Sequence, residues 1–164
     1  MPRHLFVASS ASLIGSHRMC QFMGQEGNIQ VFNEWITAHR AHDLDRLLSL
    51  VTDDITIQSS AGSSMPPANG KEEARVHWGT IFETFPDMRM EEVDLTPGEN
   101  RVFAEISHGG TMKGKMGDWE PTGKEYRTQG AFRIDFREGK IRSILSYWDT
   151  ASMLRQLGLI PGPD

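Results

Sequence analysis

The chain has 164 residues, of which 38% are hydrophobic and 24% are charged, and its formal net charge is −5. This length suits one domain with a real hydrophobic core and is too short for two ordinary domains. The acidic balance argues against a nucleic-acid-binding protein, and no apolar run approaches the length of a membrane span. Because Cys20 is the only cysteine, no intramolecular disulfide forms, and we expect a reducing, cytoplasmic location.

Residues 1–26 are expected to form an N-terminal extension that packs on a partner, followed by a domain over residues 27–164. A first helix is predicted from about Asn28, because four side chains recur at the spacing of one helix face: Phe32, Trp35, Ile36 and His39. The dipeptide His42-Asp43 offers a cap for a second helix over residues 44–51. A strand is predicted over residues 55–58, and the Ser-, Gly- and Pro-rich stretch 59–68 is predicted to be a loop.

The third predicted helix begins with a capping box, in which Asn69 is the cap and Glu72 follows three residues later. Pro86-Asp87 ends this helix. The remainder is rich in predicted strands, over residues 88–95, 101–107, 126–136 and 141–148, followed by a short helix that ends at Gly158. Helices first and consecutive strands afterwards predict an α+β domain, with three helices on one face of a curved antiparallel sheet and a pocket between them.

The turn at Glu138-Gly139 decides which face of the last hairpin is inward. A two-residue loop pairs Phe136 with Ile141, whereas a three-residue loop with a Gly bulge pairs Asp135 with Ile141, and both remain open. Arg133 and Asp135 share one face. If that face lines the pocket, the alternating side chains of Phe132, Ile134 and Phe136 form an apolar outer surface, which predicts a homodimer.

Asp149 is a candidate proton-transfer group, because it follows Tyr147-Trp148 where the last strand ends. An apolar wall raises a carboxyl pKa toward neutrality, which suits general acid/base work. The alternative is a helix N-cap, since Asp149 also precedes a short apolar helix. If Asp149 is the acid, its pKa is raised and Asn at this position abolishes proton donation; if it is the cap, Asn replaces it without effect.

Three positions carry histidines of interest. His77 lies on the apolar face of the third helix, where a structural and a functional role are both open. His108 ends a strand on the same face as Val102, Ala104 and Ile106, which is where a pocket recruits polar groups. His39 and His42 form a lone His-x-x-His without cysteine or carboxylate partners, so no metal site is predicted.

The ordered set of short motifs resembles the SnoaL-like polyketide cyclase family of the nuclear-transport-factor-2-like superfamily, over residues 28–161. The motifs are Asp43-Leu44-Asp45, Thr52-Asp53-Asp54, Gly70-Lys71-Glu72, Phe85-Pro86-Asp87, Pro121-Thr122-Gly123-Lys124, Glu138-Gly139-Lys140-Ile141, Trp148 and Gln156-Leu157-Gly158. The resemblance implies a cone-shaped fold that holds a small hydrophobic molecule. It also implies ring closure by intramolecular aldol condensation, without cofactor or metal, by a general acid/base that matches Asp149.

Two departures accompany the resemblance: the family's partner histidine falls at or near Asp135, and its Thr-His-x-Gly motif reads Thr111-Met112-Lys113-Gly114 here. We take Asp149, Asp135 and His108 as candidate catalytic residues. The candidate substrate-binding residues are Trp35, His77, Trp78, Met112, Gln129, Arg133, Tyr147 and Trp148. The alternatives are a ketosteroid-isomerase-like isomerase or epoxide hydrolase, which requires facing buried carboxylates, and a non-catalytic ligand-binding or dimerisation module, which the missing histidines favour.

Overall fold

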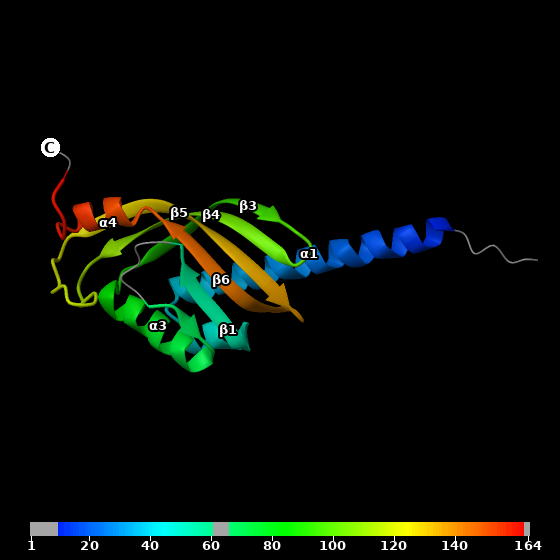
Figure 1. Cartoon of the computed structure of the whole chain (residues 1–164), viewed down its shortest axis with the longest axis horizontal. Coiled ribbons are helices and arrows are strands. Elements are labelled where there is room, and N and C mark those ends of the chain that lie inside the picture. The colour runs from blue at the N-terminus through cyan, green and yellow to red at the C-terminus, as the bar shows by residue number, and fades with distance from the viewer. Residues whose placement is uncertain (1–9, 61–65, 163–164) are drawn as a thin grey trace, which may run out of the picture.

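The computed structural model describes residues 10–60 and 66–162, and it shows a curved sheet with helices packed against it (Figure 1). The helices are α1 (Ser10–Arg40), α2 (Leu44–Ser49), α3 (Lys71–Thr84) and α4 (Thr150–Gln156). The strands are β1 (Val51–Ser59), β2 (Ala68–Asn69), β3 (Arg89–Pro97), β4 (Arg101–Thr111), β5 (Glu125–Arg137) and β6 (Lys140–Trp148). The predicted α+β class is confirmed. Within the described residues, no helix combines the length and the apolar character that a membrane crossing needs.

Helix α1 is longer than predicted. It runs without a break from Ser10, whereas the apolar pattern predicted a start near Asn28, so that start was wrong. Figure 1 shows the first part of α1 projecting beyond the sheet, and only the last part lies against the strands. Residues 1–9 of the expected extension lie outside the described residues.

The sheet has the strand order β2-β1-β6-β5-β4-β3. Strands β3 to β6 form the predicted antiparallel meander. Strands β1 and β6 instead run parallel, with Ile57 beside Ile144 and Ser59 beside Ser146. A parallel pair needs a long connection, and here everything from β2 to β5 supplies it. This pairing places β1 between β6 and the two-residue edge strand β2, where β1 also contacts α3.

The hairpin between β5 and β6 has a two-residue turn, which settles the alternative left open by the sequence. Glu138 and Gly139 both adopt positive φ, 53° and 72°, as a type I′ turn requires, and Phe136 pairs with Ile141. Phe132, Ile134 and Phe136 are therefore buried in the core beneath the helices. The candidate site residues Arg133 and Asp135 therefore do not face the pocket, and the apolar outer surface on which the homodimer prediction rested is not present.

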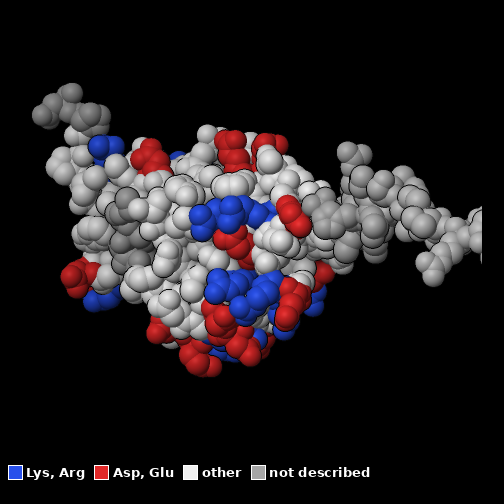
Figure 2. All heavy atoms as spheres, turned by 45° about the vertical axis from the view of Figure 1, so that its right-hand side comes forward, with Lys and Arg blue, Asp and Glu red and all other residues white. Residues whose placement is uncertain are grey.

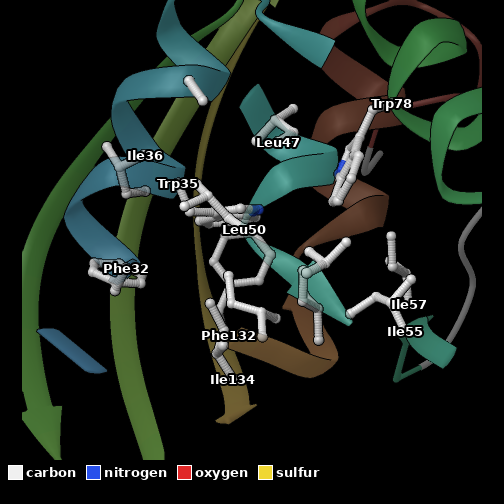
Figure 3. Close-up of a cluster of buried hydrophobic side chains, with 14 of the residues drawn as sticks. Phe32, Trp35, Ile36, Leu47, Leu50, Ile55, Ile57, Trp78, Phe132 and Ile134 are labelled. Carbon is white, nitrogen blue, oxygen red and sulfur yellow. The ribbon is translucent and has the colours of Figure 1, made fainter. Parts of the chain in front are cut away.

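The core joins the last turns of α1 to the inner face of the sheet. The predicted helical stripe is confirmed, because Phe32, Trp35, Ile36 and His39 are all at most 5% exposed. The Trp35 ring meets the Phe132 ring edge to face at 5.2 Å. Figure 3 shows Phe32, Trp35, Ile36 and Phe132 in one cluster with side chains of α2, β1 and α3. Burial of this stripe orients α1 across the sheet.

The two following helices are capped in different ways. The predicted cap of α2 is confirmed, since Asp43 Oδ1 accepts the backbone N–H of Arg46 at 2.9 Å. The capping box predicted for α3 was wrong by one residue. Gly70 is the N-cap and makes no side-chain bond, while Glu73 accepts the backbone N–H of Asn69 at 2.7 Å. Gly70 suits this place because its φ is +83°.

The side chain of Gln156 connects helix α4 to β5 by two hydrogen bonds. The Arg127 N–H donates to Gln156 Oε1 at 2.9 Å, and Gln156 Nε2 donates to the Arg127 carbonyl at 3.1 Å. The ladder between β5 and β6 ends at Gly130 and Trp148, so this amide replaces the missing strand partner of Arg127. Gly158, with a φ of +74°, then ends the helix as predicted.

Candidate functional site

A cavity of about 130 Å³ lies between the inner face of the sheet and the helices. Cavities of roughly 150 Å³ in other proteins hold one benzene ring, so this volume fits a single six-membered ring. The lining is mostly aromatic, aliphatic and thioether, and none of its described residues is a carboxylate. It consists of Trp35, His39, Ile57, Ser59, His77, Trp78, Ile81, Thr84, Phe85, Met88, Met90, His108, Met116, Tyr126, Phe132, Ile144, Ser146, Trp148, Thr150 and Met153.

His108 on β4 is a polar group of the cavity lining with a hydrogen-bond partner at each ring nitrogen. Its Nδ1 lies 3.1 Å from the Tyr126 hydroxyl and its Nε2 lies 2.9 Å from the Thr128 hydroxyl. Both partners come from β5, where Thr128 is the register partner of His108. Burial lowers the pKa of His108 to about 4. The imidazole is therefore neutral at pH 7, with one nitrogen that donates a hydrogen bond and one that accepts.

Tyr126 is almost completely buried and lines the same cavity. Burial, with a smaller contribution from the nearby Asp87 carboxylate, raises the pKa of its phenol well above the usual value. The phenol therefore keeps its proton. If His108 carries its hydrogen on Nδ1, this hydrogen is donated to the Tyr126 oxygen, and the Tyr126 O–H remains available to a ligand in the cavity.

Two further histidines line the cavity from the helix side. Burial lowers the pKa of His39 to about 3, although the Trp35 carbonyl one turn earlier opposes the effect. Burial also lowers the pKa of His77, and the Pro66 carbonyl opposes it. Neither carbonyl reaches good hydrogen-bond geometry, so both Nδ1 atoms are buried without a partner among the described residues. His77 is the more accessible of the two rings.

Trp148 forms one wall of the cavity, and Gly130 makes room for it. The Trp148 ring lies 4.0 Å from the His108 ring and 4.8 Å from the Phe132 ring, measured between centroids. A Cβ atom built on Gly130 would overlap the Trp148 indole and lie 2.6 Å from the Tyr147 carbonyl. Only a glycine on β5 therefore lets the indole lie flat against the strand.

These features agree with the sequence comparison. The profile of the SnoaL-like polyketide cyclase family matches residues 29–157. The chain belongs to this family. None of the curated proteins matches the sequence.

Solved structures support the fold of this SnoaL-like chain. A candidate SnoaL-like polyketide cyclase from Jannaschia sp. CCS1 superposes with a TM-score of 0.75 at 16% identity, covering 84% of this chain and 96% of that protein. AclR, a candidate hydroxylase from Streptomyces galilaeus, superposes with a TM-score of 0.72 at 20% identity, covering 85% of this chain and 86% of AclR. IdmH, a candidate polyketide cyclase from Streptomyces antibioticus, superposes with a TM-score of 0.66 at 23% identity, covering 80% of this chain and 98% of IdmH. At these identities the likeness establishes the fold alone.

The structure brings five of the predicted site residues together in the cavity of the SnoaL-like domain: Trp35, His77, Trp78, His108 and Trp148. Met112 is buried, but in a second apolar cluster. Gln129 and Tyr147 are exposed, and Arg133 forms an ion pair with Asp135 on the outer face of the sheet, where Asp135 also binds Arg101. These four side chains and Asp135 do not line the cavity. Among the described residues, no cluster of three or more histidine, cysteine or acidic side chains could hold a metal ion.

Asp149 lies outside the cavity lining, although its neighbours Trp148 and Thr150 belong to it. Its Oδ1 accepts the backbone N–H of Ser152 at 3.0 Å, which makes it the N-cap of α4. The Ser152 side chain and then this backbone hydrogen bond lower the pKa of the exposed carboxyl. The expected raised pKa was wrong, because no apolar wall surrounds the group, and the geometry favours the cap.

Two variants of Asp149 separate these roles. We expect Asp149→Asn to leave thermal stability unchanged, because an asparagine side chain caps a helix as well as aspartate does, and Asp149→Ala to lower it. Thermal unfolding followed by circular dichroism measures both. Equal stability of the wild type and Asp149→Ala would contradict the cap.

The sequence interpretation missed several polar residues of the cavity, chiefly Tyr126, Ser59 and Ser146. All three lie on the inward face of their strands. Once Phe132 and Ile134 are known to face inward, the two-residue period of β5 places Tyr126 and Thr128 beside them. The signal was therefore present, and it depended on the register of the hairpin.

Proposed function

We propose that this SnoaL-like protein is a cofactor-free enzyme that moves a proton on a small hydrophobic carbonyl compound. The finer proposal is an intramolecular aldol-type ring closure, as in the cyclases of its family. The observation that carries the proposal is the chain of hydrogen bonds from Thr128 through His108 to Tyr126 at the wall of an apolar cavity.

In this proposal Tyr126 is the hydrogen-bond donor to the substrate carbonyl. A carbonyl oxygen becomes negatively charged as the new bond forms, and a hydrogen bond donated in a dry cavity stabilises that charge. The Tyr126 phenol donates this bond, while His108 donates its Nδ1 hydrogen to the phenol oxygen. Thr128 in turn donates to Nε2. This arrangement stabilises the oxyanion with a hydrogen bond and without any charged group at rest, and the proton that the base removes from carbon is the one returned to the product oxygen.

The base in the same proposal is His77. Ring closure begins when a proton leaves the carbon next to a carbonyl group, and a neutral imidazole with a free nitrogen can accept it. His77 lines the cavity from α3, and burial lowers its pKa below the ordinary 6.5, so its imidazole is neutral at pH 7 and one ring nitrogen can accept a proton. It replaces the carboxylate that the family resemblance implied at Asp149.

Exchange of hydrogen for deuterium in acetophenone tests the proposal. The methyl protons of this one-ring ketone exchange with D₂O only through an enol or enolate, which NMR follows directly. We expect the wild type to accelerate the exchange and Tyr126→Phe to lower the catalysed rate about 10²-fold, because one oxyanion donor is lost. We expect His77→Gln to lower it by a similar factor.

Asp149→Asn is the matched control for this experiment and should retain the full rate. A rate that is unchanged in Tyr126→Phe but lost in Asp149→Asn would transfer the catalytic role back to Asp149.

A non-catalytic ligand-binding module is the second candidate. It is favoured by the absence of carboxylates among the described lining residues, which also leaves an isomerase or epoxide hydrolase of the two-carboxylate kind without its acids. A binding module would bind acetophenone without accelerating its exchange.

The homodimer remains a proposal with a different basis. The outer face of the sheet carries the exposed rings of Phe103 and Tyr147 beside the ion pairs of Asp135 with Arg101 and Arg133. Figure 2 shows basic and acidic side chains side by side on one face of the molecule. Such a mixed surface is suited to a second copy of the chain, and light scattering at micromolar concentration reports the mass.

A further inference from the structure

The cavity has a second polar group, formed by two serine hydroxyls on neighbouring strands. Ser59 ends β1 and Ser146 lies beside it on β6, and both line the cavity. One register step earlier, the inward pair is Ile57 and Ile144, both buried and apolar. Paired parallel strands in a core normally continue with such side chains. Two hydroxyls at the next inward step are a departure from that pattern.

The hydrogen bonds of this serine pair leave capacity for a ligand. Ser146 Oγ lies 2.9 Å from Ser59 Oγ and 3.2 Å from the Gln58 carbonyl, and it has one proton. If Ser146 donates to Gln58, then Ser59 donates to Ser146 and keeps its own lone pairs open. If Ser146 donates to Ser59, the Ser59 proton is open. In both arrangements Ser59 can still bind an oxygen function of a ligand.

Another hydroxyl in the lining is already used. The Thr84 hydroxyl lies 2.8 Å from the Thr80 carbonyl and 2.7 Å from the Lys115 carbonyl, so its proton serves the backbone. Unlike Thr84, the serine pair therefore has hydrogen-bonding capacity left for a ligand, as Tyr126 has.

The Trp148 ring lies between the two polar groups of the cavity, which are Tyr126 with His108 and Ser59 with Ser146. Trp148 follows Ser146 by two residues on the same face of β6, and its ring packs at a tilt of 54° against the ring of His108, which binds Tyr126. In the strand order, Trp148 on β6 lies between Ser59 on β1 and Tyr126 on β5, so a flat ring placed on the indole has one polar group on each side. An aromatic surface between two hydrogen-bonding groups is suited to a planar ligand with an oxygen at each end.

We infer that the ligand is a one-ring compound with two oxygen functions: a carbonyl that accepts from Tyr126, and a hydroxyl or second carbonyl that binds Ser59 and Ser146. This inference rests on the proposed function for the Tyr126 end and adds the substrate class. The serines hold the ligand and take no part in the proton transfer.

Binding of two matched probes tests it. Acetophenone and 4-hydroxyacetophenone differ only in the hydroxyl opposite the carbonyl, and NMR titration or calorimetry gives both dissociation constants. We expect the wild type to bind 4-hydroxyacetophenone about five- to tenfold more tightly, as one hydrogen bond of about 1 kcal/mol implies. Replacing both serines, Ser59→Ala with Ser146→Ala, should bring the ratio close to one.

Two control variants complete the test. Ser143→Ala changes the outward-facing serine of the same strand and should keep the wild-type preference. Tyr126→Phe should weaken both probes alike. Equal binding of the two probes to the wild type would overturn the inference and leave the proposed function standing. A preference that persists in the double serine variant would overturn it as well. If neither probe binds, the inference and the carbonyl-binding site both fail.

Discussion

Gly130→Ala is expected to close the cavity and to destabilise the protein. The new methyl group would overlap the Trp148 indole, and the nearby Tyr147 carbonyl belongs to the backbone, so the indole must move toward the cavity. Overpacking of this kind costs about 1–3 kcal/mol. Thermal unfolding should show this loss, and NMR titration should show that acetophenone no longer binds.

Gly27→Ala is the matched control for this prediction. It makes the same chemical change in α1, where a Cβ atom meets no other atom within 4 Å. Alanine favours the helix over glycine, so this variant should gain roughly 0.5–1 kcal/mol. If Gly130→Ala bound acetophenone like the wild type, Trp148 would not be held by Gly130, and the cavity wall proposed here would be wrong.

Lowering the pH from 7 to 5 is expected to destabilise the fold through two buried histidines. The pKa of His39 falls to about 3 and that of His108 to about 4 in the folded chain, against an ordinary 6.5. Below pH 6.5 these histidines therefore bind protons in the unfolded state but not in the folded state, so the free energy of unfolding decreases as the pH falls. Each histidine contributes at most about 1.4 kcal/mol per pH unit, so the expected loss over this range is roughly 2–4 kcal/mol.

The pH window separates this effect from that of the carboxylates. Asp87 has a pKa lowered by its hydrogen bonds from Thr111, and it affects stability only below its ordinary value of 3.8. Urea unfolding at a series of pH values between 7 and 4.5 measures the histidine effect. The variant His39→Phe should show a clearly smaller slope, since phenylalanine takes up no proton. An unchanged slope in this variant would show that His39 takes up its proton over the same pH range in the folded and the unfolded state.

The helices were predictable because their signals are local. The spacing of Phe32, Trp35 and Ile36 specifies one buried face of α1 from the sequence alone, and it brought Trp35 correctly to the cavity. The same periodicity in α3 placed His77 and Trp78. The early start of α1 was not predictable from this pattern, because the apolar face that packs on the sheet lies only in the last part of the helix.

The errors on β5 share one cause. Whether Arg133 or Phe132 faces inward depends on a turn whose first residue, Glu138, adopts a positive φ of 53°. Non-glycine residues adopt this conformation infrequently, so the sequence alone left the turn undecided. A one-residue slip exchanges the two faces of a strand. Gln129, Arg133 and Asp135 were therefore misplaced together, and Tyr126 was overlooked for the same reason.

Asp149 illustrates a limit of position-based inference. Its place after two aromatic residues suggested an apolar surrounding, but the strand ends at Trp148 and the chain turns directly into α4. A short polar side chain at that point satisfies a free backbone N–H, here that of Ser152. Both roles use the same residue type at the same place, so only the geometry distinguishes them.

The infrared absorption of a bound ketone tests the central claim most directly. Acetophenone labelled with ¹³C at the carbonyl carbon gives a C=O band that can be separated from the protein bands by a difference spectrum. A hydrogen bond donated by Tyr126 weakens the C=O bond, so the account predicts a lower frequency for the ketone bound to the wild type than for the ketone bound to Tyr126→Phe. The same frequency in both proteins would contradict the claim that Tyr126 polarises a carbonyl group in this cavity.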